Sequence, residues 1–258
     1  MEDLKRLHKG AAPMAIESSK SRKGNIIRGS SSRKAPKYGY VKFIIAILII
    51  IPAIFMFTNP SARASFFDYQ IGKGFERLKN YPEAKQYYGA AWANSNKTHL
   101  QARLKYAEMC NLTGQYDEAL TVTQSMIDFG ITNELLLSEV WRQNGDANMG
   151  LAIYDDAIVS YSAASKLNGN NYYALVGLGR AYRLKGDYPK SIDFLNNAIN
   201  IRELRSPEAH YELGMTYLAQ NNGADALDQF DLVLRQMASR DLREKAREQK
   251  INIIANRQ

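Results

Sequence analysis

The side chains that could perform catalysis or bind a metal are few and scattered in this chain. The three histidines, His8, His99 and His210, have no spacing that would let them share a metal ion. The acidic pair Asp155-Asp156 lies at the turn into a predicted helix, where the helix dipole favours carboxylates. The sequence contains neither a Gly-rich nucleotide loop nor a Ser nucleophile motif. We therefore predict a protein that is not an enzyme and that holds no cofactor and no metal.

The charge of the chain is concentrated at one end. The formal net charge is +8, and residues 1–64 contain 12 of the 34 Lys and Arg residues but only 3 of the 26 Asp and Glu residues. The remaining residues, 65–258, are close to neutral. A nucleic-acid-binding domain would be expected to carry a basic face on its folded part, so this distribution argues against nucleic acid as a partner.

One apolar run follows the basic segment. Residues 39–57 read GYVKFIIAILIIIPAIFMF, with Lys42 as the only charged residue. As a helix they would extend roughly 28 Å, close to the ~30 Å hydrocarbon core of a bilayer. We predict a single transmembrane helix over residues 39–58.

The basic residues also predict the orientation of this helix. Eleven Lys and Arg residues precede the apolar core of the span, whereas only Arg63, Lys73 and Arg77 follow it closely. The positive-inside rule then places residues 1–38 in the cytoplasm as a disordered basic tail, which could also contact anionic lipid head groups. The alternative is a signal peptide cleaved after Ala64, because Ala62-Arg63-Ala64 has the small-x-small form of a signal-peptidase site.

A short motif recurs in the rest of the chain. The pattern Tyr-x-x-Ala, or a degenerate form of it, occurs five times, and its fourth position is occupied by Ala84, Ala119, Ala157, Ser191 and Ala226. These positions are 35, 38, 34 and 35 residues apart. A period near 34 residues with this pattern resembles the tetratricopeptide repeat family.

The resemblance implies a fold. We expect an all-α, right-handed superhelical α-solenoid in which about five antiparallel helix pairs stack on one another. The expected repeats are residues 65–98, 100–133, 138–171, 172–205 and 207–240, followed by a capping helix over residues 241–258. On this last helix we expect Leu242, Ala246, Ile253 and Ile254 to face inward, and Arg243, Lys245, Arg247 and Lys250 to face outward.

The family pattern also predicts how each pair packs. Small residues, such as Gly72 and Gly214, should let the two helices of a pair approach closely, and large residues, such as Tyr88 and Phe230, should fill the space beside them. Cys110 should be a small buried hydrophobic residue. The third repeat fits least well, because Asn144 and Asn148 occupy positions that are usually apolar.

In this family the inner, concave face of the first helices usually binds an extended peptide or a partner helix. The resemblance therefore implies a partner-binding surface that is rich in arginine and aromatic residues, the types that most often dominate interfaces. Its candidate residues are Arg142, Tyr173, Arg180, Arg183, Tyr211 and Met215.

Two functional classes remain open. The first is a scaffold or assembly factor that is tethered to a bacterial inner membrane, has its repeats in the periplasm and binds protein components of a pilus, secretion or motor machine. The second is a membrane-tethered chaperone or import receptor that binds unfolded clients near a translocon.

Overall fold

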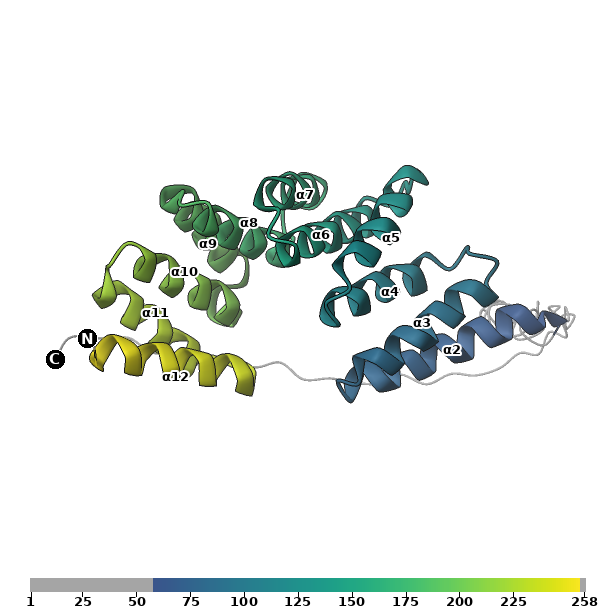
Figure 1. Cartoon of the computed structure of the whole chain (residues 1–258), viewed down its shortest axis with the longest axis horizontal. Helices are drawn as coiled ribbons and strands as arrows, with labels where there is room; N and C mark the ends of the chain where they lie inside the picture. The colour runs from purple at the N-terminus through teal and green to yellow at the C-terminus, as the bar shows by residue number, and fades with distance from the viewer. Residues whose placement is uncertain (1–57, 256–258) are drawn as a thin grey trace, which may run out of the picture. The chain divides into compact units, whose positions relative to one another are not determined.

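The computed structural model describes residues 58–255, which belong to one compact unit and are almost entirely helical (Figure 1). This part of the chain contains eleven α-helices, one short 3-10 helix and no strand. The helices are α2 (Pro60–Arg77), α3 (Tyr81–Asn94), α4 (Leu100–Leu112), α5 (Tyr116–Asp128), α6 (Glu134–Gly150), α7 (Tyr154–Leu167), α8 (Tyr172–Leu184), α9 (Tyr188–Arg202), η1 (Glu203–Arg205), α10 (Pro207–Ala219), α11 (Gly223–Arg235) and α12 (Arg240–Ala255).

The predicted transmembrane helix and the basic tail lie outside the described residues, except for Thr58. Between residues 58 and 255, no helix combines the length and the apolar character needed to cross a membrane.

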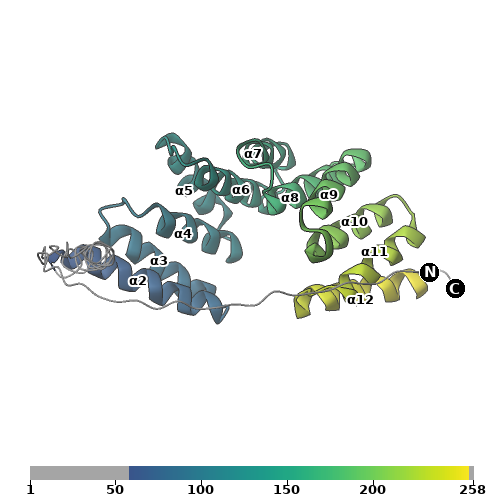
Figure 2. The same cartoon turned by 180° about the vertical axis from the view of Figure 1, so that it is seen from behind.

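The helices form five antiparallel pairs, from α2/α3 to α10/α11, and α12 follows the last pair (Figures 1 and 2). Each second helix packs against the first helix of its own pair and against the helix that follows it. The first helices α4, α6, α8 and α10 also contact one another in sequence, and α10 contacts α12. The all-α solenoid of stacked helix pairs is therefore confirmed.

The turn inside each pair has the same backbone conformation. Gly114 and Gly186 adopt positive φ angles of 77° and 82°, the left-handed conformation that favours glycine after a helix. Lys79, Ala152 and Asn221 adopt φ angles of 57°, 59° and 59° at the equivalent place in the other three pairs.

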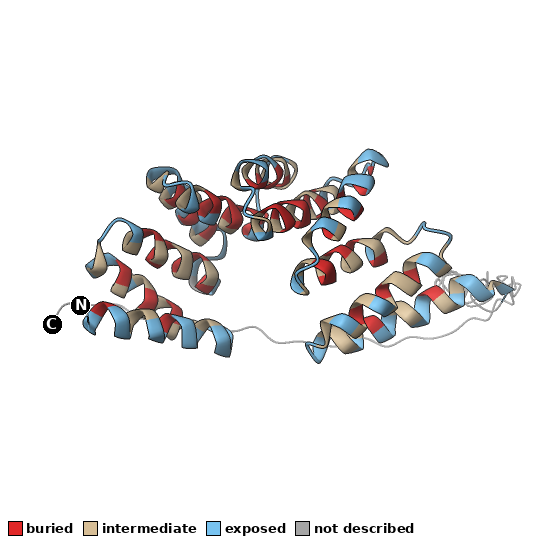
Figure 3. Cartoon of the chain, in the orientation of Figure 1, coloured by how far each residue is buried: buried red, intermediate tan, exposed pale blue. Residues whose placement is uncertain are grey.

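The core lies between the two helices of each pair and between neighbouring pairs, as the buried stripes of Figure 3 show. The small residues at the fourth motif position are all fully buried: Ala84, Ala119, Ala157, Ser191 and Ala226. The predicted close approach of the two helices at small residues is also confirmed, because a methyl group added to Gly72 or Gly214 would meet the ring of Tyr88 or Phe230 at 2.9 or 2.8 Å.

Cys110 is fully buried, and burial raises the pKa of its thiol to about 12. The thiol is therefore neutral at physiological pH, and the prediction that Cys110 acts as a small hydrophobic residue is confirmed.

The helix ends differ in places from the expected ones. Helix α2 begins at Pro60, five residues before the expected repeat, because Asn59 caps it by accepting a hydrogen bond from the Ala62 amide at 3.1 Å.

The closing helix α12 also differs in part from what was expected. We expected Ile254 to face inward, but it is half exposed. We expected Lys250 to face outward, but its ammonium group pairs with Asp231 of α11. The buried residues of α12 are Ala246 and Ile253, both of which were expected to face inward, and they lie seven positions apart on one helix face.

Candidate partner-binding groove

The structure brings all six predicted site residues together in one groove with a volume of about 560 Å³. They come from three first helices: Arg142 from α6, Tyr173, Arg180 and Arg183 from α8, and Tyr211 and Met215 from α10. The groove is also lined by Asp146, Tyr161, Val176, Gly177, Glu208, Glu212, Leu242 and Lys245.

Helical periodicity explains why these side chains share one surface. On α8, Tyr173, Gly177 and Arg180 are separated by four and three residues, which places them on one face of the helix. On α10, Glu208, Tyr211 and Met215 follow the same rule. The groove therefore consists of adjacent faces of helices that pack against one another.

The aromatic part of the groove centres on Tyr173, whose side chain is 46% exposed. The guanidinium group of Arg142 lies 5.7 Å from the centre of its ring, and that of Arg202 lies 4.8 Å away. These cations restrict the ring without covering it, so it offers a large and rigid contact surface. Tyr211 is half-buried, and its ring packs against Phe230 at a centroid distance of 5.7 Å.

Arg142 is held inside the protein and is not available to a partner. Its guanidinium group pairs with Glu139 and, at 2.5 Å, with Asp146, and only 12% of its side chain is exposed. Burial lowers the pKa of Arg142, but the two carboxylates outweigh it and raise the pKa above its ordinary value. We conclude that Arg142 positions other groups, including the Tyr173 ring.

Asp146 links Arg142 to the Tyr161 hydroxyl. Its carboxylate accepts a hydrogen bond of 2.6 Å from the Tyr161 hydroxyl, while Arg142 occupies its other oxygen. Burial raises the pKa of Asp146, and the Arg142 charge opposes this effect. The phenol can approach because Gly177 has no side chain: a methyl group there would lie 2.5 Å from the Tyr161 ring.

Arg183 and Arg180 differ in their availability, although the sequence analysis treated them alike. Arg183 pairs with Glu212 at 2.8 Å, and both side chains are largely buried. Arg180 lies 3.8 Å from the same carboxylate and is 55% exposed. Of the three predicted arginines, Arg180 is therefore the one that can reach a ligand.

Several residues that line the groove were not predicted from the sequence. Helix α12 supplies Leu242 and Lys245, but we had expected Lys245 to point away from the array. The side chain of Lys245 is 54% exposed, and its ammonium group pairs with Asp241 at 2.9 Å. Glu212 was also missed, although its position between Tyr211 and Met215 on α10 could have indicated it. The closing helix thus both covers α11 and lines one side of the groove.

The histidines have structural surroundings. His99 caps α4, because its Nδ1 atom accepts a hydrogen bond of 3.1 Å from the Ala102 amide. His210 is buried, and its Nδ1 atom lies 2.8 Å from the Gln229 amide oxygen. Within residues 58–255, no group of three or more His, Cys, Asp or Glu side chains could hold a metal ion.

Comparisons with known proteins agree with the fold. Two family models, both described as tetratricopeptide repeat, match residues 142–203 and residues 207–231. The first segment includes the second half of α6 and all of α8, and the second includes all of α10. No curated protein matches the sequence of the chain.

Several solved structures resemble the chain at low sequence identity. TTC0263, a thermophilic TPR protein of Thermus thermophilus, is 20% identical with a TM-score of 0.60, and the match covers 72% of this chain and 99% of that one. Pseudomonas aeruginosa pilF is 14% identical with a TM-score of 0.56, covering 75% and 90%. MamA from Desulfovibrio magneticus RS-1 is 18% identical with a TM-score of 0.52, covering 67% and 94%. At these identities the likeness concerns the fold alone.

Proposed function

We propose, from the premise that the chain is a tetratricopeptide repeat protein, that it is a membrane-tethered scaffold whose groove binds a protein partner. Domains of this family bind protein partners, and the groove between α6, α8, α10 and α12 supports the same role here. The observation that carries the proposal is the arrangement of Tyr173, Arg180 and Met215 on one accessible surface.

The charges of the groove favour a partner segment with an acidic residue. Four cations and three acids line it, and two of the pairs, Arg142 with Asp146 and Arg183 with Glu212, neutralise each other. Arg180 has only a long contact with Glu212, so it can form a shorter ion pair with an incoming carboxylate. The exposed ring of Tyr173 and the half-buried side chain of Met215 would contact the apolar part of the same segment.

The membrane tether and the compartment are parts of the proposal that rest on the sequence. The apolar residues 39–58 and the basic residues before them favour one span in a bacterial inner membrane, with a cytoplasmic N-terminus and a periplasmic repeat array. A scaffold anchored in this way could hold components of a pilus, a secretion system or a motor during assembly.

The second candidate, a tethered chaperone or import receptor, differs in how it would use the groove. A scaffold would bind one partner stably, whereas a chaperone would bind many unfolded clients briefly and with little sequence preference. The exposed guanidinium group of Arg180, which would form a specific ion pair with a partner carboxylate, favours the first, because promiscuous binding surfaces are commonly flexible and Met-rich.

Affinity purification of the full chain from native membranes in mild detergent tests the proposal. Arg180→Glu should remove the co-purifying partner, because it reverses the exposed charge of the groove. Lys190→Glu is the matched control: its side chain is 58% exposed, similar to that of Arg180, and lies on the second helix α9 outside the groove. Equal recovery of the partner with Arg180→Glu and Lys190→Glu would show that the partner binds elsewhere.

A further inference from the structure

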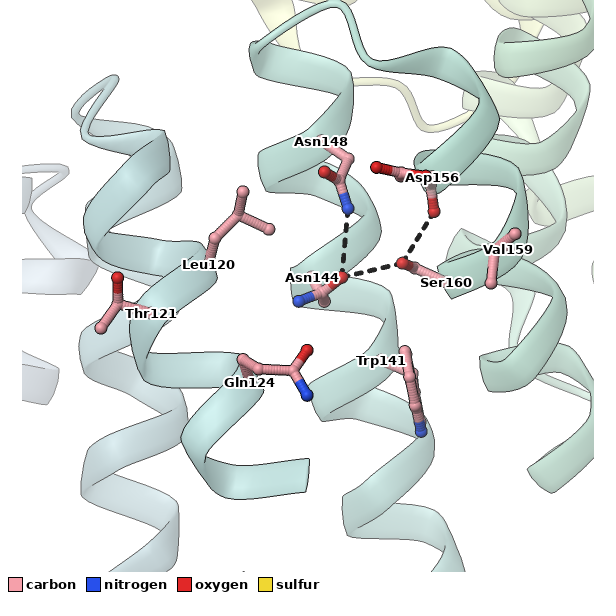
Figure 4. A pocket seen from close by; sticks show the side chains of 9 residues that line it. All are labelled: Leu120, Thr121, Gln124, Trp141, Asn144, Asn148, Asp156, Val159 and Ser160. Carbon is pink, nitrogen blue, oxygen red and sulfur yellow. Dashed lines mark hydrogen bonds between the residues drawn. The ribbon is translucent and has the colours of Figure 1, made fainter. Parts of the chain in front are cut away.

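A second pocket, which shares no residue with the groove, lies among helices α5, α6 and α7 (Figure 4). Its volume is about 430 Å³. Helix α6 packs against both α5 and α7 and forms the floor with Trp141, Asn144 and Asn148. The walls consist of Leu120, Thr121 and Gln124 from α5, and of Asp156, Val159 and Ser160 from α7.

The floor contains polar groups at positions where the family pattern favours apolar ones. Asn144 and Asn148 are each only 5% exposed. A buried amide is costly unless its donors and acceptors find partners, so the bonds that each amide makes are informative.

A chain of hydrogen bonds runs through the Asn144 amide. Its Nδ2 atom donates to the Thr123 hydroxyl at 2.9 Å, and that hydroxyl lies 2.8 Å from the carbonyl oxygen of Ala119. Its Oδ1 atom accepts from Nδ2 of Asn148 at 3.1 Å and lies 2.8 Å from the Ser160 hydroxyl. The same hydroxyl also lies 2.8 Å from the carbonyl oxygen of Asp156.

The orientation of Asn148 follows from that of Asn144. Since Asn144 presents an acceptor, Asn148 must present its Nδ2 group to it, as Figure 4 shows. The Oδ1 atom of Asn148 then takes part in none of the hydrogen bonds found among residues 58–255. The pocket thus contains a carbonyl-type acceptor without a partner, on a side chain that is 95% buried.

The pocket contains a second acceptor, the carboxylate of Asp156. The neighbouring acid Asp155 pairs with Lys185, whereas Asp156 is exposed and belongs to none of the ion pairs in the described part of the chain. No Lys, Arg or His lines the pocket, so Asp156 gives it a net charge of −1. The remaining surface includes the apolar side chains of Leu120, Trp141 and Val159.

We propose that this pocket binds an arginine side chain presented by a protein partner. The guanidinium group carries only donors, which match the free Asn148 oxygen and the Asp156 carboxylate. Its planar face suits the Trp141 indole, and its alkyl stem suits Leu120 and Val159. This site is independent of the Arg180 groove, and a partner could occupy either one or both.

Spectroscopy of the two tryptophans can test the proposal directly. The full chain, labelled with ¹⁵N-tryptophan and held in detergent micelles, should give one indole N–H signal from Trp141 and one from Trp92. Trp92 lies on α3, outside the pocket, and serves as an internal reference. The probe is acetyl-arginine methylamide, for which we expect saturable binding in the millimolar range, on the order of 1 mM, as suits a ligand of this size. The Trp141 signal should shift, and the Trp92 signal should not.

Two comparisons separate specific binding from a general effect of the probe. The uncharged isostere acetyl-citrulline methylamide should bind about fivefold more weakly, as should the arginine probe to Asp156→Asn. Asp155→Asn is the matched control, because it removes an adjacent charge that does not line the pocket, and it should bind like the unchanged chain. Lysine methylamide should bind more weakly than the arginine probe, because it cannot stack on the indole.

The proposal fails if the Trp141 signal does not saturate, or if Trp92 shifts in parallel. It also fails if citrulline binds as tightly as arginine, or if Asp155→Asn weakens binding as much as Asp156→Asn. Both acids are exposed, so neither substitution should disturb the fold, and circular dichroism would verify this.

Discussion

Glycines of the first helices allow close contact with large side chains of the second helices. A methyl group added to Gly145, Gly179 or Gly214 would lie 2.7, 2.4 or 2.8 Å from Tyr161, Leu195 or Phe230. These distances are too short for a real side chain, and the neighbouring side chains are buried. The missing side chain is therefore what lets the two helices of a pair pack.

This packing leads to a residue-level prediction. Gly214→Ala should lower the free energy of unfolding by about 1–3 kcal/mol, because the added methyl group would push against Phe230. Gly74→Ala is the control, since nothing lies within 4 Å of its added methyl group on α2, and it should raise stability by about 0.5–1 kcal/mol. Urea unfolding followed by circular dichroism measures both, and a loss of similar size in the two variants would contradict the account.

At this scale, spacing was enough to predict the close approach of the helices at small residues but not the charge pairing. The family pattern placed Arg142, Arg180 and Arg183 on one face without indicating which of them is free. Asp146 follows Arg142 by four residues, which was a usable signal for their ion pair. The partner of Arg183, Glu212, lies 29 residues away, and only the stacking of α10 on α8 brings them together.

Among the elements, the five turns within the helix pairs share one conformation but not one residue type. Gly114 and Gly186 are of the residue type expected in such turns, because glycine commonly follows a helix in the left-handed conformation. Ala152 gave no such signal, yet its φ angle is 59°. The neighbouring helices impose this conformation on a residue that does not favour it.

Exchanging glycine and alanine between two of these turns should therefore have opposite effects. Gly186→Ala should lower the free energy of unfolding by about 1 kcal/mol, since a β-carbon is unfavourable in the left-handed conformation. Ala152→Gly should leave stability unchanged or raise it by up to about 1 kcal/mol, because the relieved strain is offset by the entropy of an unfolded glycine. Melting temperatures of the two variants provide the measurement. A clear loss with Ala152→Gly would show that the alanine side chain itself stabilises the turn.

For the whole molecule, the motif that recurs five times was sufficient to predict the number of helix pairs, because each pair buries its apolar face only against its neighbours. The bounds were less predictable at the ends, where no neighbouring repeat constrains the chain. Asn59 and Pro60 begin α2 five residues before the first expected repeat. The role of α12 in the groove was also missed, because its sequence matches no repeat and its orientation depends on α10 and α11.

The predicted topology can be tested on the whole chain. A reporter that is active only outside the cytoplasm, fused after Gln258, should be active, because the basic excess before residues 39–58 favours a cytoplasmic N-terminus. Changing the basic residues of 1–38 to glutamine should reduce this activity. Activity of a reporter that works only in the cytoplasm would reverse the orientation.

The central claim is that the groove around Arg180 binds a protein partner, and photo-crosslinking from inside the groove tests it most directly. A photo-reactive phenylalanine analogue at position 173 keeps an aromatic ring at the exposed site, and one at position 129, which is 67% exposed and lies outside the groove, is the control. In the cells that naturally make the protein, position 173 should give a discrete crosslinked product that disappears with Arg180→Glu and persists with Lys190→Glu. The same product from position 129, or one that persists at full yield with Arg180→Glu, would contradict the account.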